Sequence, residues 1–169
     1  MKLEKAKRIA EAVKSEMTPY CHRIEIAGSI RRNKPEVGDI EIVAIPKTYP
    51  CGLFGDMKER HPELVKLIDR WEKVKGDAAT GKYTQRILPD GIKLDIFFAI
   101  PENWGLIYAL RTGSAYYSYK VLASGWVKHG YHSVDGMLTI EGVVVPVRKE
   151  TELFELAGVK WVDPEEREL

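Results

Sequence analysis

Three acidic residues on two predicted strands are the side chains whose spacing most clearly indicates chemistry. Asp39 and Glu41 stand two residues apart in a segment with apolar residues on both faces, so an extended strand would point both carboxylates the same way. Asp95 lies near the start of a second such segment, 92–100. Carboxylates gathered in one place repel each other, and a hard dication would offset that repulsion. The set suits phosphoryl transfer assisted by two metal ions roughly 3.5–4 Å apart.

A Gly-Ser turn and a basic loop precede these acids. Gly28 allows backbone N–H groups to come close to a phosphate, and Ser29 adds a hydroxyl. Arg32 follows three residues after Ser29, and we expect its neighbours Arg31 and Lys34 to be solvated loop residues. An Asp-x-Glu pair is often only a solvated strand edge, and a Gly-Ser pair alone carries no signal. The ordered set of turn, basic residues and acids on two strands favours the metal site.

These motifs resemble those of a known superfamily. The spacing of Gly28-Ser29, Arg32, Asp39-x-Glu41 and Asp95 is similar to that of nucleotidyltransferases. The later Thr-Gly-Ser at 112–114 and the closing segment 156–167 resemble the family X DNA polymerases, DNA polymerase beta and its relatives. The resemblance covers nearly the whole chain but only the palm and thumb of that family. It implies an α+β fold, with a palm of mixed β-sheet and helices over 1–103 and a small α/β thumb subdomain over 104–169.

The resemblance also implies roles for the motif residues. Asp39 and Glu41 would bridge two Mg²⁺ ions, for which Mn²⁺ can substitute, and Asp95 would bind the catalytic ion and help to take up the hydroxyl proton. Ser29 and Arg32 would contact the outer phosphates, a task that suits the bidentate guanidinium. The full set of implied nucleotide-binding residues is Gly28, Ser29, Arg32, Thr112, Gly113 and Ser114.

Two basic residues near the third acid are candidates for DNA contact. Lys93 shares a strand face with Asp95, and it could hold that carboxylate or a primer phosphate. Arg86 shares a face with Lys82 and Thr84 on the preceding predicted strand. For each of these basic residues, plain solvation is an equal alternative.

The sequence therefore predicts a metal-dependent DNA nucleotidyltransferase that extends a primer 3′-OH and releases pyrophosphate, in DNA repair or gap filling. Its partners would be primer–template or gapped DNA and a nucleoside triphosphate. One alternative is a two-metal nucleotidyltransferase with a non-DNA acceptor, against which the Thr-Gly-Ser motif argues. The other is a DNA-binding module without activity, against which the presence of all three acids argues.

Composition bounds these hypotheses. The 169 residues are 44% hydrophobic and 30% charged, as in a globular protein, and no apolar run reaches the length of a membrane helix. The net charge is only +1, but residues 1–34 hold nine Lys and Arg against four Glu, which is compatible with one DNA-facing side. Cys21 and Cys51 lack metal-ligand spacing and are expected to be free thiols. We expect a cytoplasmic monomer without membrane contact.

Periodicity and turn residues predict the elements that position the motifs. Pro89-Asp90-Gly91 joins two strands as a hairpin that ends at the Asp95 strand, and 46–62 reads as irregular. The other predicted elements are helices at 3–16, 63–71, 104–111, 114–128 and 151–158, strands at 23–27 and 82–88, and a hairpin over 137–147.

Overall fold

The computed structural model describes residues 1–168, which form two compact units. Unit 1 consists of Met1–Ile26 and Pro35–Ala99. Unit 2 consists of Ala27–Lys34 and the chain from Ile100 onward. The sequence-based boundary after residue 103 lies four residues beyond this division, and the Gly-Ser segment groups with the second unit rather than the first.

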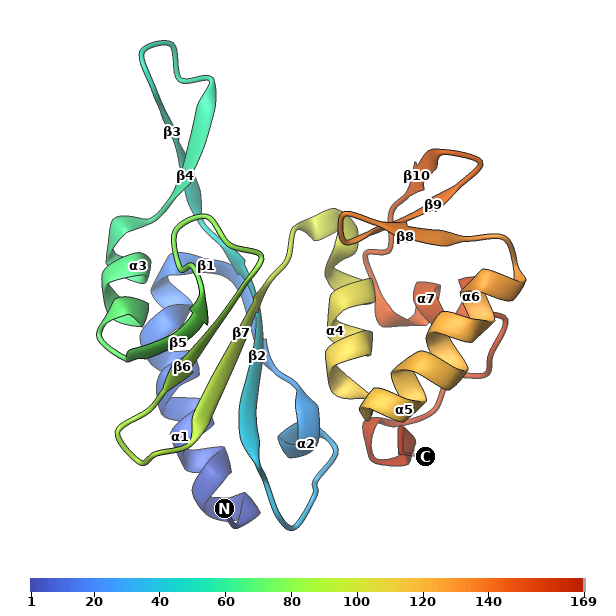
Figure 1. Ribbon diagram of the computed structural model, residues 1–169, viewed down its shortest axis with the longest axis horizontal. Helices are drawn as coiled ribbons and strands as arrows, with labels where there is room; N and C mark the ends of the chain where they lie inside the picture. The colour runs from blue at the N-terminus through green and yellow to red at the C-terminus, as the bar shows by residue number, and fades with distance from the viewer. Residues whose placement is uncertain (169) are drawn as a thin grey trace. The chain divides into compact units, whose positions relative to one another are not determined.

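Unit 1 is built on a five-stranded mixed sheet, as predicted for an α+β fold (Figure 1). β2 and β7 are parallel neighbours, whereas every other adjacent pair in this sheet is antiparallel. β2 lies inside the sheet, which explains its apolar residues on both faces. In spatial order the strands are β1 (Cys21–Ile26), β2 (Asp39–Pro46), β7 (Lys93–Phe98), β6 (Tyr83–Ile87) and β5 (Glu72–Gly76).

Two helices cover one face of this sheet. α1 (Leu3–Met17) buries an apolar stripe at helical spacing, and α3 (Pro62–Asp69) follows His61, whose side chain accepts a hydrogen bond from the Glu63 amide. Both helices lie on the same side of the sheet (Figure 1). The strand residues beneath them include Ile40, Ile42, Ala44, Leu94 and Ile96, all of which are fully buried.

The structure corrects two parts of the sequence prediction in unit 1. The segment expected to be irregular contains the hairpin of β3 (Thr48–Cys51) and β4 (Met57–Arg60), which extends beyond the five-stranded sheet (Figure 1). Gly52 and Gly55 supply the positive φ angles of its turn. β5 was also missed, because all five of its residues are exposed and it shows no apolar alternation.

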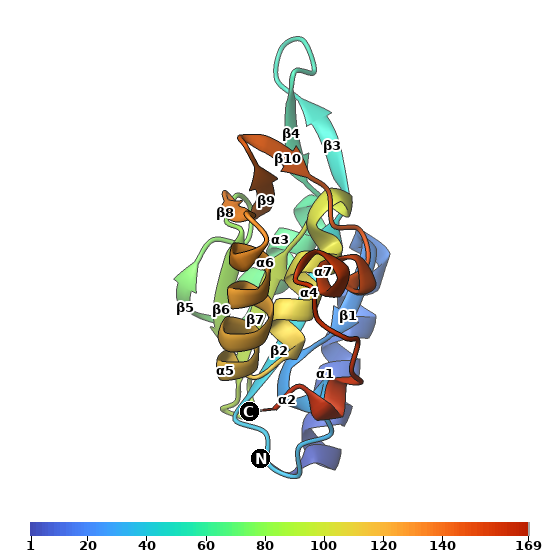
Figure 2. The same ribbon diagram turned by 90° about the vertical axis from the view of Figure 1, so that its right-hand side faces the viewer.

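Unit 2 packs helices against one another beside a small antiparallel sheet. α4 (Trp104–Thr112) contacts α7 (Glu150–Leu156), and the helix expected over 114–128 is a continuous run of α5 (Ala115–Tyr117), the π-helical turn η3 (Ser118–Ala123) and α6 (Ser124–Lys128). The core residues are Leu106, Ala109, Tyr117, Leu122, Trp126, Leu138, Val147, Leu153 and Phe154. The remaining elements are α2 (Gly28–Arg31), the sheet of β8 (His132–Val134), β9 (Met137–Ile140) and β10 (Val143–Val145), and the short helices η2 (Pro101–Asn103) and η4 (Pro164–Glu166). Figure 2 shows these helices from a second direction.

Two further expectations bear on the kind of protein. Cys21 and Cys51 are both free, and burial raises the pKa of the Cys21 thiol to about 11 despite the opposing charge of Lys47. Among residues 1–168, every helix falls short of the length and apolar character that crossing a bilayer requires.

Gly105→Ala should destabilise unit 2. A β-carbon at Gly105 would stand 2.3 Å from the backbone carbon and oxygen of Lys149, and backbone atoms cannot rotate away. We expect a cost of about 3 kcal/mol from overpacking, against a gain of about 1 kcal/mol from Ala in a helix, measured by urea unfolding. The control is Gly38→Ala, because a β-carbon there meets nothing within 4 Å. Equal stability of the two variants would contradict this packing.

Candidate functional site

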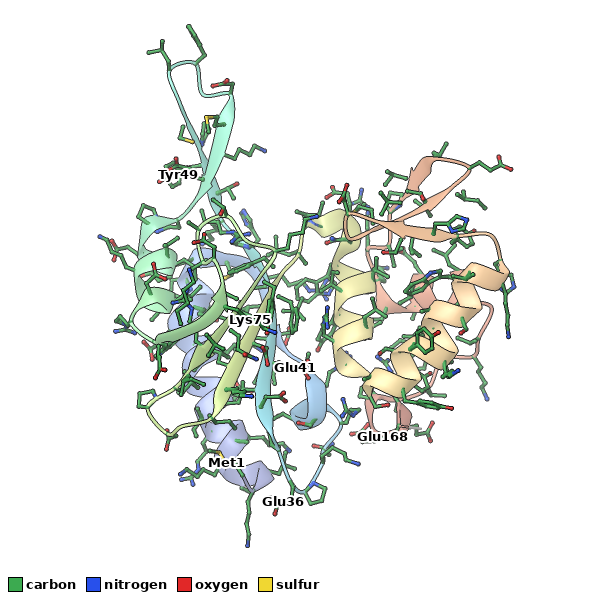
Figure 3. All side chains as sticks on the ribbon, in the orientation of Figure 1. Met1, Glu36, Glu41, Tyr49, Lys75 and Glu168 are labelled. Carbon is green, nitrogen blue, oxygen red and sulfur yellow. The ribbon has the colours of Figure 1, made fainter. Side chains whose placement is uncertain are left out.

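The three predicted acids lie on one face of the unit 1 sheet. Parallel pairing of β2 with β7 sets Asp39 beside Lys93 and Glu41 beside Asp95. Paired residues on adjacent strands point to the same face, with Cα atoms about 4.8 Å apart. This face is opposite to the one that α1 and α3 cover, and Glu41 is labelled on β2 in Figure 3. The prediction that the acids occupy two adjacent strands is confirmed.

Asp95 is the most enclosed of the three acids and is held by two hydrogen bonds. Its side chain is 6% exposed, whereas Asp39 and Glu41 are half-buried. Its Oδ1 accepts a short hydrogen bond from the Tyr83 hydroxyl and a second, of 2.8 Å, from Gln85 Nε2. Both donors lie on β6, where Gln85 is the register partner of Asp95.

Sequence reasoning missed Tyr83 and Gln85 as partners of Asp95. It considered Lys93 as a residue that could hold this carboxylate, but Lys93 is exposed and pairs with Asp39 in the register, and the donors to Asp95 are Tyr83 and Gln85. The sequence could have indicated these partners, because the predicted hairpin through 89–91 pairs the 82–88 strand with the Asp95 strand and so places Gln85 opposite Asp95.

The donor set of the three acids fits Mg²⁺. Magnesium prefers oxygen ligands and is usually held by one or two carboxylates together with substrate phosphates. Within residues 1–168, no three His, Cys, Asp or Glu side chains lie close enough together to hold a metal ion as they stand. An ion bound here would therefore have to draw Asp39 and Glu41 toward Asp95.

The Gly-Ser segment opens unit 2 with a buried hydroxyl that lacks a partner. Gly28 begins α2 with φ 61°, which favours glycine. The Ser29 Oγ is buried and makes no hydrogen bond to any of the described residues. Leaving a buried hydroxyl unsatisfied costs about 1–3 kcal/mol, so this atom is suited to receive a polar ligand.

Arg31 anchors the same segment within unit 2, contrary to the expectation of a solvated loop residue. Its guanidinium donates two hydrogen bonds of 2.7 Å to Glu150 and one of 2.6 Å to Thr112 Oγ1, and it stacks on the Tyr108 ring. Arg167 Nη1 donates a further 2.7 Å bond to Glu150. Burial alone would raise the pKa of Glu150, but the two arginines hold it below its ordinary value.

Arg32, the predicted phosphate contact, is engaged by a carboxylate. Its Nε donates a short hydrogen bond to Glu168, and its Nη1 donates one of 2.7 Å to the Thr112 carbonyl. Lys34 lies 3.5 Å from the other oxygen of Glu168. Although burial opposes the shift, Arg32 and Lys34 lower the pKa of Glu168. The structure thus brings together two predicted nucleotide-binding residues, Arg32 and Thr112. The Glu168 carboxylate lies between the cationic groups of Arg32 and Lys34.

The rest of the Thr-Gly-Ser motif forms a joint between helices of unit 2. Ser114 Oγ accepts a 3.1 Å hydrogen bond from the Tyr117 amide and so caps α5, while its own amide donates to the Arg167 carbonyl. A β-carbon at Gly113 would stand 2.8 Å from Ser118 Oγ, so a larger residue at this position would require that side chain to move.

Arg86 does not fit the expected DNA contact. It lies opposite Leu94 on the face that the helices cover, and it is 2% exposed. Its guanidinium is paired with Asp69 at 2.9 Å and donates to Thr84 and to the Trp71 carbonyl. Of the predicted basic stripe, Thr84 and Arg86 therefore point into unit 1, whereas Lys82, which precedes β6, is exposed.

Comparison with known proteins supports the fold. No family model matches the sequence, and no curated protein matches it. Among solved structures, this chain is similar to Leishmania infantum polymerase beta in a ternary P/T complex, with a TM-score of 0.72 and 17% sequence identity over 99% of this chain and 76% of that one. At this identity the likeness shows a polymerase beta-like fold.

Glu150→Gln should destabilise the protein and reduce its sensitivity to acid. The folded-state pKa of Glu150 is lowered, so its contribution is present above the unfolded pKa of about 4.3 and is lost as the pH falls through the folded value. Leaving Arg31 and Arg167 without this partner should cost about 3–5 kcal/mol at pH 7. Urea unfolding between pH 3 and pH 7 measures both effects.

The matched control is Glu155→Gln, which removes an exposed carboxylate from the same helix. We expect its stability to stay close to that of the wild type. If both variants unfold alike at every pH, the buried ion cluster does not stabilise unit 2.

Proposed function

We propose that this protein is a metal-dependent DNA nucleotidyltransferase that adds nucleotides to a primer 3′-OH and releases pyrophosphate. The observation that carries the proposal is the parallel register of β2 and β7, which sets Glu41 beside Asp95 with Asp39 two residues away on the same face. Three carboxylates on one strand face are costly without a cation, and they are the ligand type that Mg²⁺ uses in phosphoryl transfer.

In this reaction the primer 3′ oxygen attacks the α-phosphorus of the nucleotide. The bond from that phosphorus to the oxygen that bridges to the β-phosphate breaks, and pyrophosphate leaves. Asp39, Glu41 and Asp95 would hold Mg²⁺, which when bound would supply positive charge to the attacking and leaving oxygens. Asp95 would also help to take up the proton of the attacking hydroxyl.

Two residues of unit 2 would bind the outer phosphates of the nucleotide. The unpartnered hydroxyl of Ser29 would donate to the terminal phosphate. Arg32 would offer its guanidinium once Glu168 has been displaced, because a guanidinium binds phosphate oxygens bidentately as it does carboxylate oxygens. Gly28 would let the backbone come close to the phosphates. Thr112, Gly113 and Ser114 would support the binding indirectly, through the bond from Arg32 to the Thr112 carbonyl and the cap that Ser114 forms on α5.

DNA is the proposed acceptor because the structural relative was solved as a ternary P/T complex and because Lys93 is exposed beside Asp39 on the carboxylate face. Lys93 remains a candidate contact for a primer phosphate. One fold can serve different acceptors, so the acceptor has to be tested directly. Incubation with gapped, nicked and single-stranded primers, each with deoxy- or ribonucleotides, would test it.

Asp95→Asn and Asp39→Asn should each abolish most primer extension on gapped DNA with Mg²⁺. Each variant keeps the size of the side chain but removes a metal-binding charge, and several kcal/mol of transition-state stabilisation correspond to at least about a thousandfold in rate. The control is Asp90→Asn, which removes an exposed carboxylate from the turn that precedes β7. Extension by Asp95→Asn at near the wild-type rate would overturn the proposed roles of the acids.

Glu168→Gln should strengthen nucleotide binding, because Arg32 would then be released from an ionic partner. The pair is partly exposed, so we expect a change in Kd of about fivefold, equivalent to about 1 kcal/mol. Fluorescence titration with a deoxynucleoside triphosphate and Mg²⁺ measures it. The control is Glu166→Gln, which neutralises an exposed carboxylate two residues away. An equal gain in nucleotide affinity in that variant would show that the loss of negative charge, rather than the release of Arg32, is responsible.

A further inference from the structure

The hydrogen bonds of Asp95 are distributed unevenly between its two oxygens. A carboxylate can accept bonds at both oxygens, yet Tyr83 and Gln85 donate to the same one, Oδ1. Among residues 1–168 no donor bonds to Oδ2, which is thus left to a ligand. Because these two bonds act on one atom, they fix the rotation of the carboxylate rather than merely satisfying it.

The direction of these bonds follows from the order of the strands. β7 lies between β6 and β2 in the sheet, so the two donors approach Asp95 from one side and Glu41 stands on the other. Oδ1 is tied toward β6. The free oxygen of Asp95 is therefore the one available to an ion shared with the acids of β2.

Tyr83 is itself well fixed. Its ring stacks on that of Phe97, its register partner, with centroids 5.0 Å apart and an interplanar angle of 25°. Lys75, labelled in Figure 3, places its Nζ 5.3 Å from the centroid of the Tyr83 ring. With the ring held by these two contacts, the hydroxyl has a defined position over Oδ1.

We infer that Tyr83, together with Gln85, is a positioning residue that turns Asp95 so that Oδ2 is presented to the divalent cation. This inference rests on the proposed function, because it assigns a role in the same metal site. Groups that hydrogen-bond a metal ligand without touching the metal typically change metal affinity or activity by about 10–100-fold when they are removed.

The test is Tyr83→Phe, which removes only the hydroxyl and keeps the ring stacked on Phe97 and under Lys75. We expect Mn²⁺ to bind about tenfold more weakly, measured by the electron paramagnetic resonance signal of free Mn²⁺ during titration. The Mg²⁺ concentration for half-maximal primer extension should rise by a similar factor, with the rate largely recovered at saturating Mg²⁺ and the nucleotide KM unchanged. The thermal unfolding midpoint should stay at the wild-type value.

Tyr49→Phe is the matched control, since the Tyr49 hydroxyl also donates to a carboxylate, that of Glu59, but on the β3–β4 hairpin. It should leave Mn²⁺ affinity unchanged. Gln85→Met removes the second donor at nearly constant size, and the double variant should lose less than the product of the two single losses, because both bonds end on one oxygen.

The outcomes separate this inference from the proposed function. Wild-type Mn²⁺ affinity in Tyr83→Phe would overturn the inference, whatever the activity. If the wild type binds Mn²⁺ in a manner lost in Asp95→Asn and weakened in Tyr83→Phe, yet extends no primer, the positioning role stands and the proposed acceptor fails. If the wild type binds no Mn²⁺, both fail together.

Discussion

Repulsion among the carboxylates that β2 and β7 hold on one sheet face is the constraint on which the chemistry of unit 1 depends. The parallel register leaves Asp39, Glu41 and Asp95 on one face, while the opposite face of the same strands carries the fully buried core of the unit. The apolar face fixes the register, because a slip of one residue would bury the acids and expose the core. The fold therefore holds the acids in place at an electrostatic cost that only hydrogen-bond donors or a cation can offset.

In unit 2, two arginines offset the cost of burying a carboxylate. Glu150 is 10% exposed at the start of α7, and Arg31 and Arg167 approach it from segments 119 and 17 residues away in the chain. A buried charge is tolerated when it is paired and hydrogen-bonded on several sides. The consequence is that the Gly-Ser segment and the segment after α7 are both tied to α7 through the Glu150 carboxylate, while Arg31 also ties the Gly-Ser segment to α4. Ser29 lies two residues before Arg31 in this segment, and its buried hydroxyl has no hydrogen-bond partner among residues 1–168.

Short-range patterns were enough to predict most elements of the fold and the strands that carry the acids. Apolar residues on both faces identified the strands of Asp39 and Asp95, helical spacing identified α1, and a capping residue followed by a terminal glycine identified α7. β5 could not be found in this way, because an exposed and charged edge strand shows no apolar period. The partner of Arg31 could not be predicted either, since the position of this residue in a basic loop does not indicate a contact with a glutamate more than a hundred residues later. Arg86 shows the same limit, because alternation places residues on a face without saying which face is buried.

The most direct test of the central claim is a crystal structure of the protein soaked with Mg²⁺ and a nucleoside triphosphate analogue that cannot be hydrolysed at the α-phosphate. The account predicts density for divalent ions coordinated by Asp39, Glu41 and Asp95, with Asp95 bound through Oδ2 and the outer phosphates at Ser29 and Arg32. An ordered nucleotide with the three carboxylates apart and no ion among them would contradict it.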